Sequence, residues 1–267
     1  MTGVPRQSAP SLDNRAIERE QQRKYRTCYG PANLDYRSLP SNDYFARLAA
    51  LRLRLLQERY EGGRILDLGC GAGDYLLPAA QFAEAAIGLD FSPELIAVAQ
   101  QRATAKGAAN VSVAVANGRN IPLRDESISL IFSFSCLYHI PAVDQVIAEC
   151  ARVLRRGGTA ILEFGALYSL NTIVCRAYPE LAAPCHVPLR EFRAMLSRAG
   201  LTIEMDRPFQ ILPLWGNKPW WLRPILHPFW KQTLQRQVAG RMLDEWISAL
   251  WPFRVLAFRH IVICRRT

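Results

Sequence analysis

Hydrophobic positions fall along the middle of the chain in two kinds of segment, short apolar runs and longer amphipathic stretches. The apolar runs predict buried strands near residues 65–69, 86–90, 111–116, 129–135 and 159–164. The amphipathic stretches predict helices near residues 43–59, 75–84, 93–106 and 142–155. Because strands and helices alternate strictly after the first helix, the pattern predicts an α/β fold with a doubly wound parallel sheet and right-handed crossovers.

Two of the predicted helix ends carry local signals. Ser92-Pro93-Glu94 combines a capping residue with a first-turn proline, which is typical of a helix start. Arg155-Arg156-Gly157-Gly158 combines cations with glycine, which is typical of a helix end. Further on, residues 188–200 predict another amphipathic helix, residues 201–206 a sixth strand and residues 255–266 a seventh.

The segment ILDLGCGAG, residues 65–73, is the clearest chemical motif. Gly69, Gly71 and Gly73 form a turn in which side chains would obstruct a ligand lying against the backbone. The second strand ends at Asp90, where a carboxylate can accept both hydroxyls of a ribose. This succession of strand, glycine turn, helix, strand and acid predicts a site for an adenosine-containing cofactor.

Two kinds of cofactor fit such a turn, and its acidic residues distinguish them. A nicotinamide or flavin fingerprint has a third glycine where this chain has Asp74, and Asp67 lies two residues before the first glycine. Negative charge at this helix N-terminus opposes a pyrophosphate. S-adenosylmethionine carries a sulfonium and an amino group, so the same acids favour it over a dinucleotide.

Four segments occur in the order in which class I S-adenosylmethionine-dependent methyltransferases carry them, and the chain resembles that family from about Tyr44 to Gly165. These segments are ILDLGCGAG at 65–73, IGLDFSPELIAVA at 87–99, NGRNIPLRDESISLIFSFSCLYHI at 117–140 and ECARVLRRGGTAILEF at 149–164. The resemblance implies a Rossmann-like, seven-stranded sheet with an antiparallel last strand. It also implies methyltransferase activity with S-adenosylmethionine as the cofactor.

The resemblance also assigns cofactor-binding roles beyond Asp67 and the three glycines of the turn. It places Asp90 at the ribose, Phe91 at the adenine, the backbone amide of Gly118 at the adenine ring and the backbone near Ser135 at the methionine amino group. The chain departs from the family at Asn117, where relatives usually carry an aspartate for the adenine amino group. The amide oxygen of asparagine still accepts a hydrogen bond, so the role is retained with less charge.

A catalytic base is expected just after the fourth strand. Methyl transfer is an in-line displacement, so the enzyme must hold the acceptor near the methyl carbon and remove the proton of a hydroxyl. His139, with Tyr138 beside it, matches a pair that relatives often direct at the acceptor, and an ordinary pKa near 6.5 would suit a base. The alternative is that His139 packs or caps the loop before Pro141. His186 is a second candidate, either facing the acceptor or capping the next helix.

An unusual segment lies between the sixth and seventh strands. Residues 209–230 carry four tryptophans and four prolines, and Trp246 and Trp251 follow. The prolines and charges interrupt the segment too often for a membrane-spanning helix. Three interpretations stay open: a lid that places Trp215 and Trp220 on the substrate, contact with a bilayer surface or lipid-linked substrate, and a local core or homodimer contact.

Length and composition indicate one catalytic core with extensions. We expect a partly flexible N-terminal extension over 1–42, the core over 43–208, an insertion or lid over 209–253 and the final strand over 254–267. The seven cysteines form no CxxC pair or metal-ligand spacing, which favours a reducing compartment and no metal. The first residues lack the apolar core of a secretion signal, so we expect a cytoplasmic protein.

The net charge of +10 is unevenly distributed. Lys and Arg exceed Asp and Glu by 5 over residues 1–60 and by 8 over residues 166–267, whereas the carboxylates exceed by 3 over residues 61–165. Solvated surface arginines explain this division, and so does attraction of an anionic substrate or surface by the flanks.

The acceptor class follows from what the fourth strand and its flanks contain. Residues 133–136 read Ser-Phe-Ser-Cys, not the polar residue, two prolines and aromatic of enzymes that methylate base amines, and no RNA-binding module is evident. We therefore expect a small or lipophilic acceptor in a biosynthetic pathway, with oxygen methylated in preference to carbon or nitrogen. The alternatives are an RNA methyltransferase that uses the basic flanks, and a cofactor-binding protein that couples methylation to substrate rearrangement.

Overall fold

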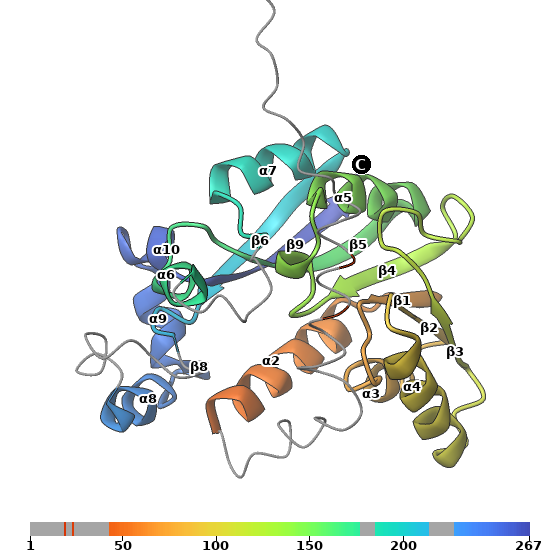
Figure 1. Ribbon diagram of the computed structural model, residues 1–267, viewed down its shortest axis with the longest axis horizontal. Helices are drawn as coiled ribbons and strands as arrows, with labels where there is room; N and C mark the ends of the chain where they lie inside the picture. The colour runs from red at the N-terminus through yellow and green to blue at the C-terminus, as the bar shows by residue number, and fades with distance from the viewer. Residues whose placement is uncertain (1–18, 20–22, 24–42, 177–184, 214–226) are drawn as a thin grey trace, which may run out of the picture.

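A seven-stranded sheet forms the centre of the protein (Figure 1). The computed structural model describes residues 19, 23, 43–176, 185–213 and 227–267. In chain order the strands of this sheet are β1 (Arg64–Leu68), β2 (Ala85–Asp90), β3 (Val111–Val115), β4 (Ile128–Ser133), β5 (Leu154–Gly165), β6 (Leu201–Phe209) and β9 (Arg259–Arg266). Their spatial order is β3-β2-β1-β4-β5-β9-β6.

The predicted doubly wound sheet is confirmed. Strands β1 to β5 pair in parallel, and the chain reverses direction across the sheet beside β1, where β4 lies on the side opposite β2. The last strand, β9, inserts between β5 and β6 and runs antiparallel to both. All five parallel strands therefore bring their carboxyl ends to one edge, which is where open α/β sheets bind ligands.

Helices cover both faces of the sheet (Figure 1). One face carries α2 (Asp43–Arg59), α3 (Leu76–Ala79) and α4 (Pro93–Ala105), and the other carries α5 (Val143–Val153) and α7 (Leu189–Arg198). The remaining elements are η2 (Leu137–His139), α6 (Leu170–Arg176), α8 (Pro228–Leu234), β7 (Gln237–Val238), β8 (Arg241–Met242), α9 (Leu243–Ala249) and α10 (Phe253–Leu256).

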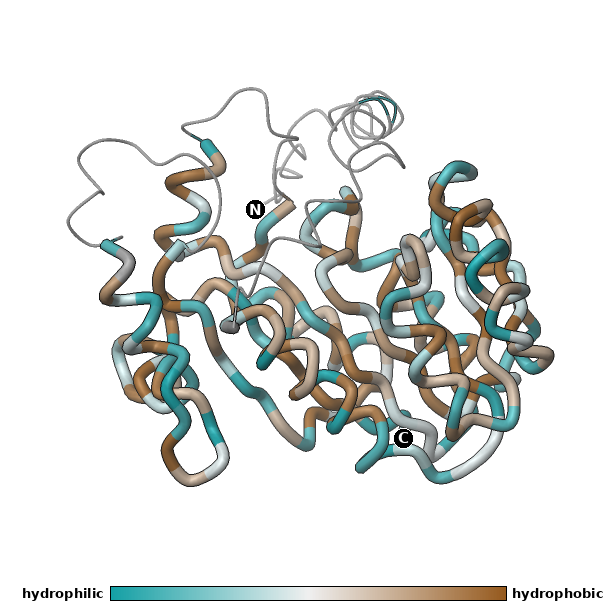
Figure 2. The backbone as a smooth tube through the Cα atoms, turned by 90° about the horizontal axis from the view of Figure 1, so that it is seen from below, coloured by the Kyte–Doolittle hydropathy of each residue, from teal (hydrophilic) through white to brown (hydrophobic). Residues whose placement is uncertain are grey.

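Each face of the sheet has its own hydrophobic core. Leu48, Leu55 and Phe132 belong to the core under α2, whereas Ile147 and Phe192 belong to the core under α5 and α7. Figure 2 shows the hydrophilic and hydrophobic positions alternating along the helices, as two solvent-facing layers require. Between these layers the strands are rigid, so residues at their ends hold fixed positions.

Two predicted boundaries are wrong. The helix expected at 75–84 is the short α3, because the chain must reach the start of β2 at Ala85. The expected helix stop at 155–158 lies within β5, because Leu154 already pairs with Ile128 and the strand continues through an irregularity to Thr159. Helix α5 therefore ends at Val153.

Helix α9, from the segment expected to be an insertion, is fixed to the core through a buried carboxylate. Asp244 accepts hydrogen bonds from the hydroxyl of Tyr44 at 2.6 Å and from the backbone amides of Gln210 and Ile211 at 2.5 and 3.0 Å. These contacts join α9, α2 and the end of β6. The start of the described core and its last third are therefore held together beside the ligand-binding edge of the sheet.

Candidate active site

The glycine turn after β1 lies against the end of β2. The amides of Gly69 and Cys70 both donate to the carbonyl of Leu89, at 2.7 and 3.1 Å. Gly69 has a φ of +79°, and a Cβ added there would lie 2.2 Å from the Sγ atom of Cys136. Only glycine satisfies both conditions. Cys70, inside the turn, is buried, and burial raises the pKa of its thiol, so it is not a nucleophile.

Carboxylates gather behind this turn. Asp67, on β1, is 3% exposed, and its Oδ2 atom has no hydrogen-bond partner among the described residues. Burial, and then the charges of Asp90 and Asp74, hold the pKa of Asp67 well above its usual range. Asp90 accepts hydrogen bonds from the amides of Gly71 and Ser92, both at 2.9 Å. An acid with one unpartnered oxygen, next to a second acid, fits a cationic ligand, which is what the charges of S-adenosylmethionine require.

The residues predicted to contact the adenine follow the two neighbouring strands. Phe91 comes directly after β2 and is half-buried, whereas Asn117 and Gly118 follow β3. The Oδ1 atom of Asn117 accepts a hydrogen bond from the amide of Arg119 at 3.0 Å. Because β2 and β3 are paired to their ends, these residues lie at the same edge as Asp90.

Ser135, just beyond β4, has an unusual backbone and two charged neighbours. Its φ of 55° lies in the left-handed region, which is uncommon for a residue other than glycine and is frequent at functional sites. The hydroxyl of Ser135 accepts hydrogen bonds from Nη2 of Arg52 at 3.0 Å and Nη1 of Arg259 at 2.9 Å.

Both arginines also bind one glutamate, and the three residues form a buried arginine cluster: Arg52, Glu163 and Arg259. The Nε atom of Arg52 lies 2.9 Å from Oε2 of Glu163, and Nη1 of Arg259 contacts Oε1. The side chains are 5%, 0% and 8% exposed in that order. The two guanidinium groups hold the pKa of Glu163 below its usual value in spite of its burial, so this carboxylate stays ionised.

Tyr138 and His139 lie in η2 next to the arginine cluster. Nη1 of Arg259 donates to the hydroxyl of Tyr138 at 2.7 Å, and the Tyr138 and His139 rings are 4.5 Å apart. Burial, then His186 and Arg259, lower the pKa of His139 to about 3. The expected pKa near 6.5 is therefore wrong, because the loss of water and the nearby guanidinium of Arg259 disfavour the charged imidazole.

Comparison with known proteins agrees with this geometry. The family model "Methyltransferase domain" matches residues 66–162. Methyltransferase GfsG of Streptomyces halstedii is 29% identical over 184 residues, which cover 64% of this chain and 66% of that protein. This chain carries a class I S-adenosylmethionine-dependent methyltransferase domain.

Two further relatives of the methyltransferase domain differ from each other in their acceptors. Malonyl-[acyl-carrier protein] O-methyltransferase of Methylococcus capsulatus is 37% identical over 97 residues, covering 36% of this chain and 34% of that protein. Geranyl diphosphate C-methyltransferase of Streptomyces coelicolor, a solved structure, has a TM-score of 0.58 and 17% identity, covering 83% of this chain and 80% of that one. The chain thus matches at most about two thirds of either curated relative, and the solved structure shares the fold.

His186 lies against the same aromatic group in the methyltransferase domain, although not as a helix cap. Helix α7 begins after Pro188, which makes no side-chain cap. The Nδ1 atom of His186 instead lies 2.7 Å from the hydroxyl of Thr172, and its ring contacts Phe258 and Tyr138 with centroids 5.0 and 6.1 Å apart. The capping interpretation is therefore wrong, and His186 is one wall of an aromatic group with Tyr138 and Phe258.

The tryptophan-rich segment is described only in part. Trp215, Trp220 and Trp221 lie outside the described residues. The other three tryptophans, Trp230, Trp246 and Trp251, are 44%, 41% and 84% exposed. These three side chains are therefore not part of a local hydrophobic core. Among the described residues no helix is long and apolar enough to cross a membrane.

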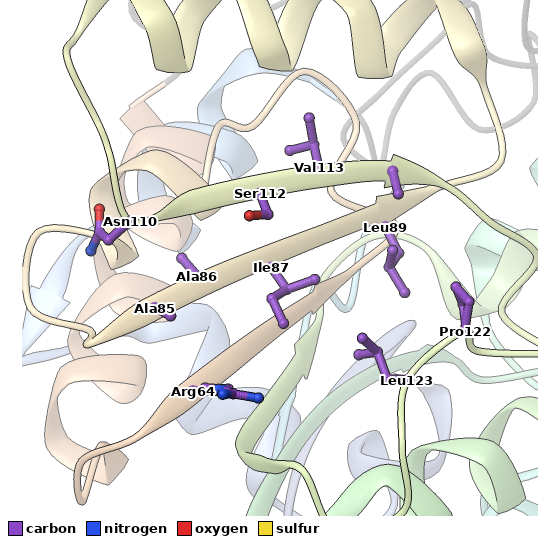
Figure 3. Close-up of a pocket in the computed structure, with 11 residues that line it drawn as sticks. Arg64, Ala85, Ala86, Ile87, Leu89, Asn110, Ser112, Val113, Pro122 and Leu123 are labelled. Atoms are coloured by element: carbon purple, nitrogen blue, oxygen red, sulfur yellow. The ribbon is translucent and has the colours of Figure 1, made fainter.

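A separate cleft of about 390 Å³ lies over the edge strands β2 and β3 (Figure 3). Ile87, Leu89 and Val113 line it from the sheet, and Pro122 and Leu123 line it from the loop before β4. None of the residues predicted to bind the cofactor is among its lining residues. In the chain, β3 is followed by β4 with no helix between them.

The arginine cluster contains the site residues that the sequence patterns did not identify. Their signal is a charge at an apolar position. Arg52 lies between Leu48 and Leu56 on the buried stripe of α2, and Glu163 interrupts the apolar end of β5. A charged residue at a core position needs a buried partner or a ligand, so this pattern would have marked both residues.

Proposed function

We propose that this protein is an S-adenosylmethionine-dependent methyltransferase that acts on a small or lipophilic acceptor, with oxygen methylated in preference to carbon or nitrogen. The observation that carries the proposal is the unpartnered Oδ2 atom of Asp67 beside Asp90, behind the glycine turn. Leaving a buried carboxylate oxygen without a partner is costly, and a bound sulfonium or ammonium group removes that cost. The motif order of the methyltransferase family supports the same cofactor.

We propose the following division of the cofactor among the chain's residues. Asp90 accepts the ribose hydroxyls, Phe91 and Gly118 border the adenine with Asn117, and Asp67 faces the amino end. When bound, S-adenosylmethionine supplies a methyl group whose carbon–sulfur bond breaks as the acceptor atom bonds to the carbon, which leaves S-adenosylhomocysteine.

His139 is our candidate for the group that takes the acceptor's proton, and Tyr138 for the group that positions it. A lowered pKa keeps the imidazole of His139 neutral at all ordinary pH values, so one of its ring nitrogens carries no proton. The weak basicity suffices because a hydroxyl oxygen becomes strongly acidic as it gains the methyl group. A proton transfer that would be uphill before the displacement is then downhill within it.

The aromatic wall favours an acceptor with an apolar body. Tyr138, His186 and Phe258 are all buried and surround one another beyond the arginine cluster. Rings of this kind suit flat or lipophilic molecules. By their names, two of the relatives act on malonyl-[acyl-carrier protein] and geranyl diphosphate, which is consistent with a small or lipid-linked acceptor.

The tryptophan-rich segment is proposed as a lid over this acceptor, with Trp215 and Trp220 as substrate contacts. The exposed Trp230 and Trp251 equally suit peripheral contact with a membrane surface or a homodimer contact. We place the protein in the cytoplasm, and we expect no nucleic acid among its substrates. RNA or DNA binding that weakens steeply with salt would contradict this last expectation.

The test is methyl transfer itself. Protein incubated with S-adenosylmethionine and candidate acceptors should form S-adenosylhomocysteine and a product heavier by one methyl group. A His139→Ala variant should lose about 100- to 10,000-fold in kcat with cofactor affinity unchanged. Gln145→Ala, an exposed position on α5, is the matched control and should keep full activity. Unchanged turnover in His139→Ala would end the role of His139 but not the proposed reaction.

A further inference from the structure

The arginine cluster carries more positive than negative charge. Two guanidinium groups share the single carboxylate of Glu163, and none of the three residues is more than 8% exposed. Burying a charge without a counter-ion is unfavourable, so an excess cation at a ligand-binding edge indicates a place for an anion.

The next carboxylate beyond the cluster does not supply that negative charge. Asp244 is buried and already accepts three hydrogen bonds, from Tyr44 and from the amides of Gln210 and Ile211. Between Asp244 and the cluster, the side chain of Gln210 accepts from Nε of Arg259 at 2.6 Å, so Arg259 meets a neutral amide on that side.

The two arginines face different parts of the site. The guanidinium of Arg52 lies over the rings of Tyr75 and Phe134, with its carbon 5.4 and 5.2 Å from their centroids, on the side of the glycine turn. The guanidinium of Arg259 lies over Tyr138 and Phe258, at 5.1 and 5.2 Å, on the side of the aromatic wall. Arg52 therefore belongs with the cofactor, and Arg259 with the acceptor.

One end of the Arg259 guanidinium is unused. Its Nε atom binds Gln210, and its Nη1 atom binds Ser135, Tyr138 and Glu163. Its Nη2 atom makes no hydrogen bond within the part of the chain that the structure describes. It is not among the fully buried polar atoms that lack a hydrogen-bond partner. These contacts fix the side chain, and Nη2 is the guanidinium nitrogen left to donate to a ligand.

We propose that Arg259 is a specificity residue that binds an anionic group, a carboxylate or phosphate, of the methyl acceptor. The inference rests on the proposed function, since it assigns the substrate class for the same site. A held guanidinium suits such a group because its planar fork matches two oxygen atoms and little side-chain freedom is lost on binding. The substrate class is thus an apolar or aromatic acid, or a phosphorylated compound of similar size.

The first experiment uses wild-type protein saturated with S-adenosylhomocysteine. Calorimetric titration with benzoate, phenyl phosphate, benzyl alcohol and benzylamine compares probes that differ mainly in charge. We expect the two anions to bind at least about tenfold more tightly than the alcohol, and the amine to bind least. Equal affinities, or preference for the amine, would overturn the inference whatever the variants do.

The second experiment locates the anion with matched variants. Arg259→Gln and Arg259→Lys should each weaken benzoate binding at least about fivefold, with the larger loss in Gln, because Lys keeps the charge but not the fork. Glu163→Gln should strengthen it. Arg265→Gln removes the same charge from the far end of β9, where Arg265 pairs with exposed Glu61 and Glu204, and should change nothing.

The readouts separate this inference from the proposed function. Affinity for S-adenosylhomocysteine, measured first, tests the cofactor site, and its absence in the wild-type protein contradicts the proposed function. Normal cofactor binding without anion preference contradicts the inference about Arg259 alone. If Arg259→Lys weakens S-adenosylhomocysteine more than benzoate, the anion is the cofactor's own carboxylate and the assignment to the acceptor is wrong.

Discussion

The acid-lined glycine turn and the arginine cluster lie at the same edge of one sheet, yet they have opposite charge and opposite origins in the chain. Asp67 and Asp90 lie 23 residues apart and belong to one strand, turn, helix and strand unit. Arg52, Glu163 and Arg259 come from α2, β5 and β9. The acids prepare the site for a cation, whereas the arginines leave it with an excess cation. A ligand pair with a positive sulfur on one side and an anion on the other fits this division.

The largest expected effect comes from removing Glu163, the carboxylate that both arginines share. Glu163→Ala leaves two buried guanidinium groups without their carboxylate, so we expect a loss of about 3–5 kcal/mol in the free energy of unfolding. Denaturant titration measures it. Glu204→Ala, which removes a partly exposed partner of Arg59 and Arg265, should cost less than about 1 kcal/mol. Similar losses in both variants would mean that the buried carboxylate of Glu163 contributes no more to stability than a partly exposed one.

On the acid side, the expected effect is on binding. Asp90→Ala removes the carboxylate proposed for the ribose, so the affinity for S-adenosylhomocysteine should fall about 10- to 100-fold. Calorimetry of the variant and of Asp125→Ala, an exposed acid paired with Arg152, gives the comparison. An undiminished affinity in Asp90→Ala would place the nucleoside elsewhere.

The pH dependence of cofactor binding tests whether the carboxyl group of Asp67 loses its proton when the cofactor binds. Its raised pKa means that the carboxyl keeps its proton above the ordinary value of 3.8, so a cation must displace that proton. S-adenosylmethionine binding should therefore release up to about one proton and tighten as the pH rises above that value. Titrations in buffers of different ionisation enthalpy measure the release. Asp67→Asn should abolish it, and an unchanged release would assign it to another group.

The pH dependence of turnover should show no step from His139. Its pKa of about 3 leaves the imidazole neutral through the whole working range, so kcat should have no acidic limb near pH 6.5. A pH–rate profile at saturating cofactor and acceptor decides this. A limb near 6.5 that disappears in His139→Gln would show that the bound site restores the ordinary basicity of the imidazole.

The features that the sequence predicts correctly are those that depend on residues close together in the chain. The alternation of apolar runs and helices predicts the parallel sheet, and the acids at the glycine turn predict the cofactor, because both signals are local. Leu154 and the residues after it were expected to end a helix, yet pairing with Ile128 makes them part of β5, since strand pairing outweighs local glycine signals. The lowered pKa of His139 depends first on its burial in the folded protein and then on His186 and Arg259, which lie 47 and 120 residues away in the chain.

The sequence indicates that a charged residue of the arginine cluster lies at a core position, but it does not predict which residues contact one another. A charge on the apolar stripe of α2 is visible, but its partner is 111 residues away on β5. The order of β9 between β5 and β6 then decides that Arg259 reaches the same carboxylate. Such contacts depend on strand order, and strand order comes from the packing of the whole chain.

The most direct test of the account is calorimetric titration of the full chain with S-adenosylmethionine, S-adenosylhomocysteine and NADH under one set of conditions. We expect saturable binding of the first two compounds and no binding of NADH, because the acids behind the glycine turn favour a cation and repel a pyrophosphate. Tight binding of NADH without binding of either S-adenosyl compound would contradict it.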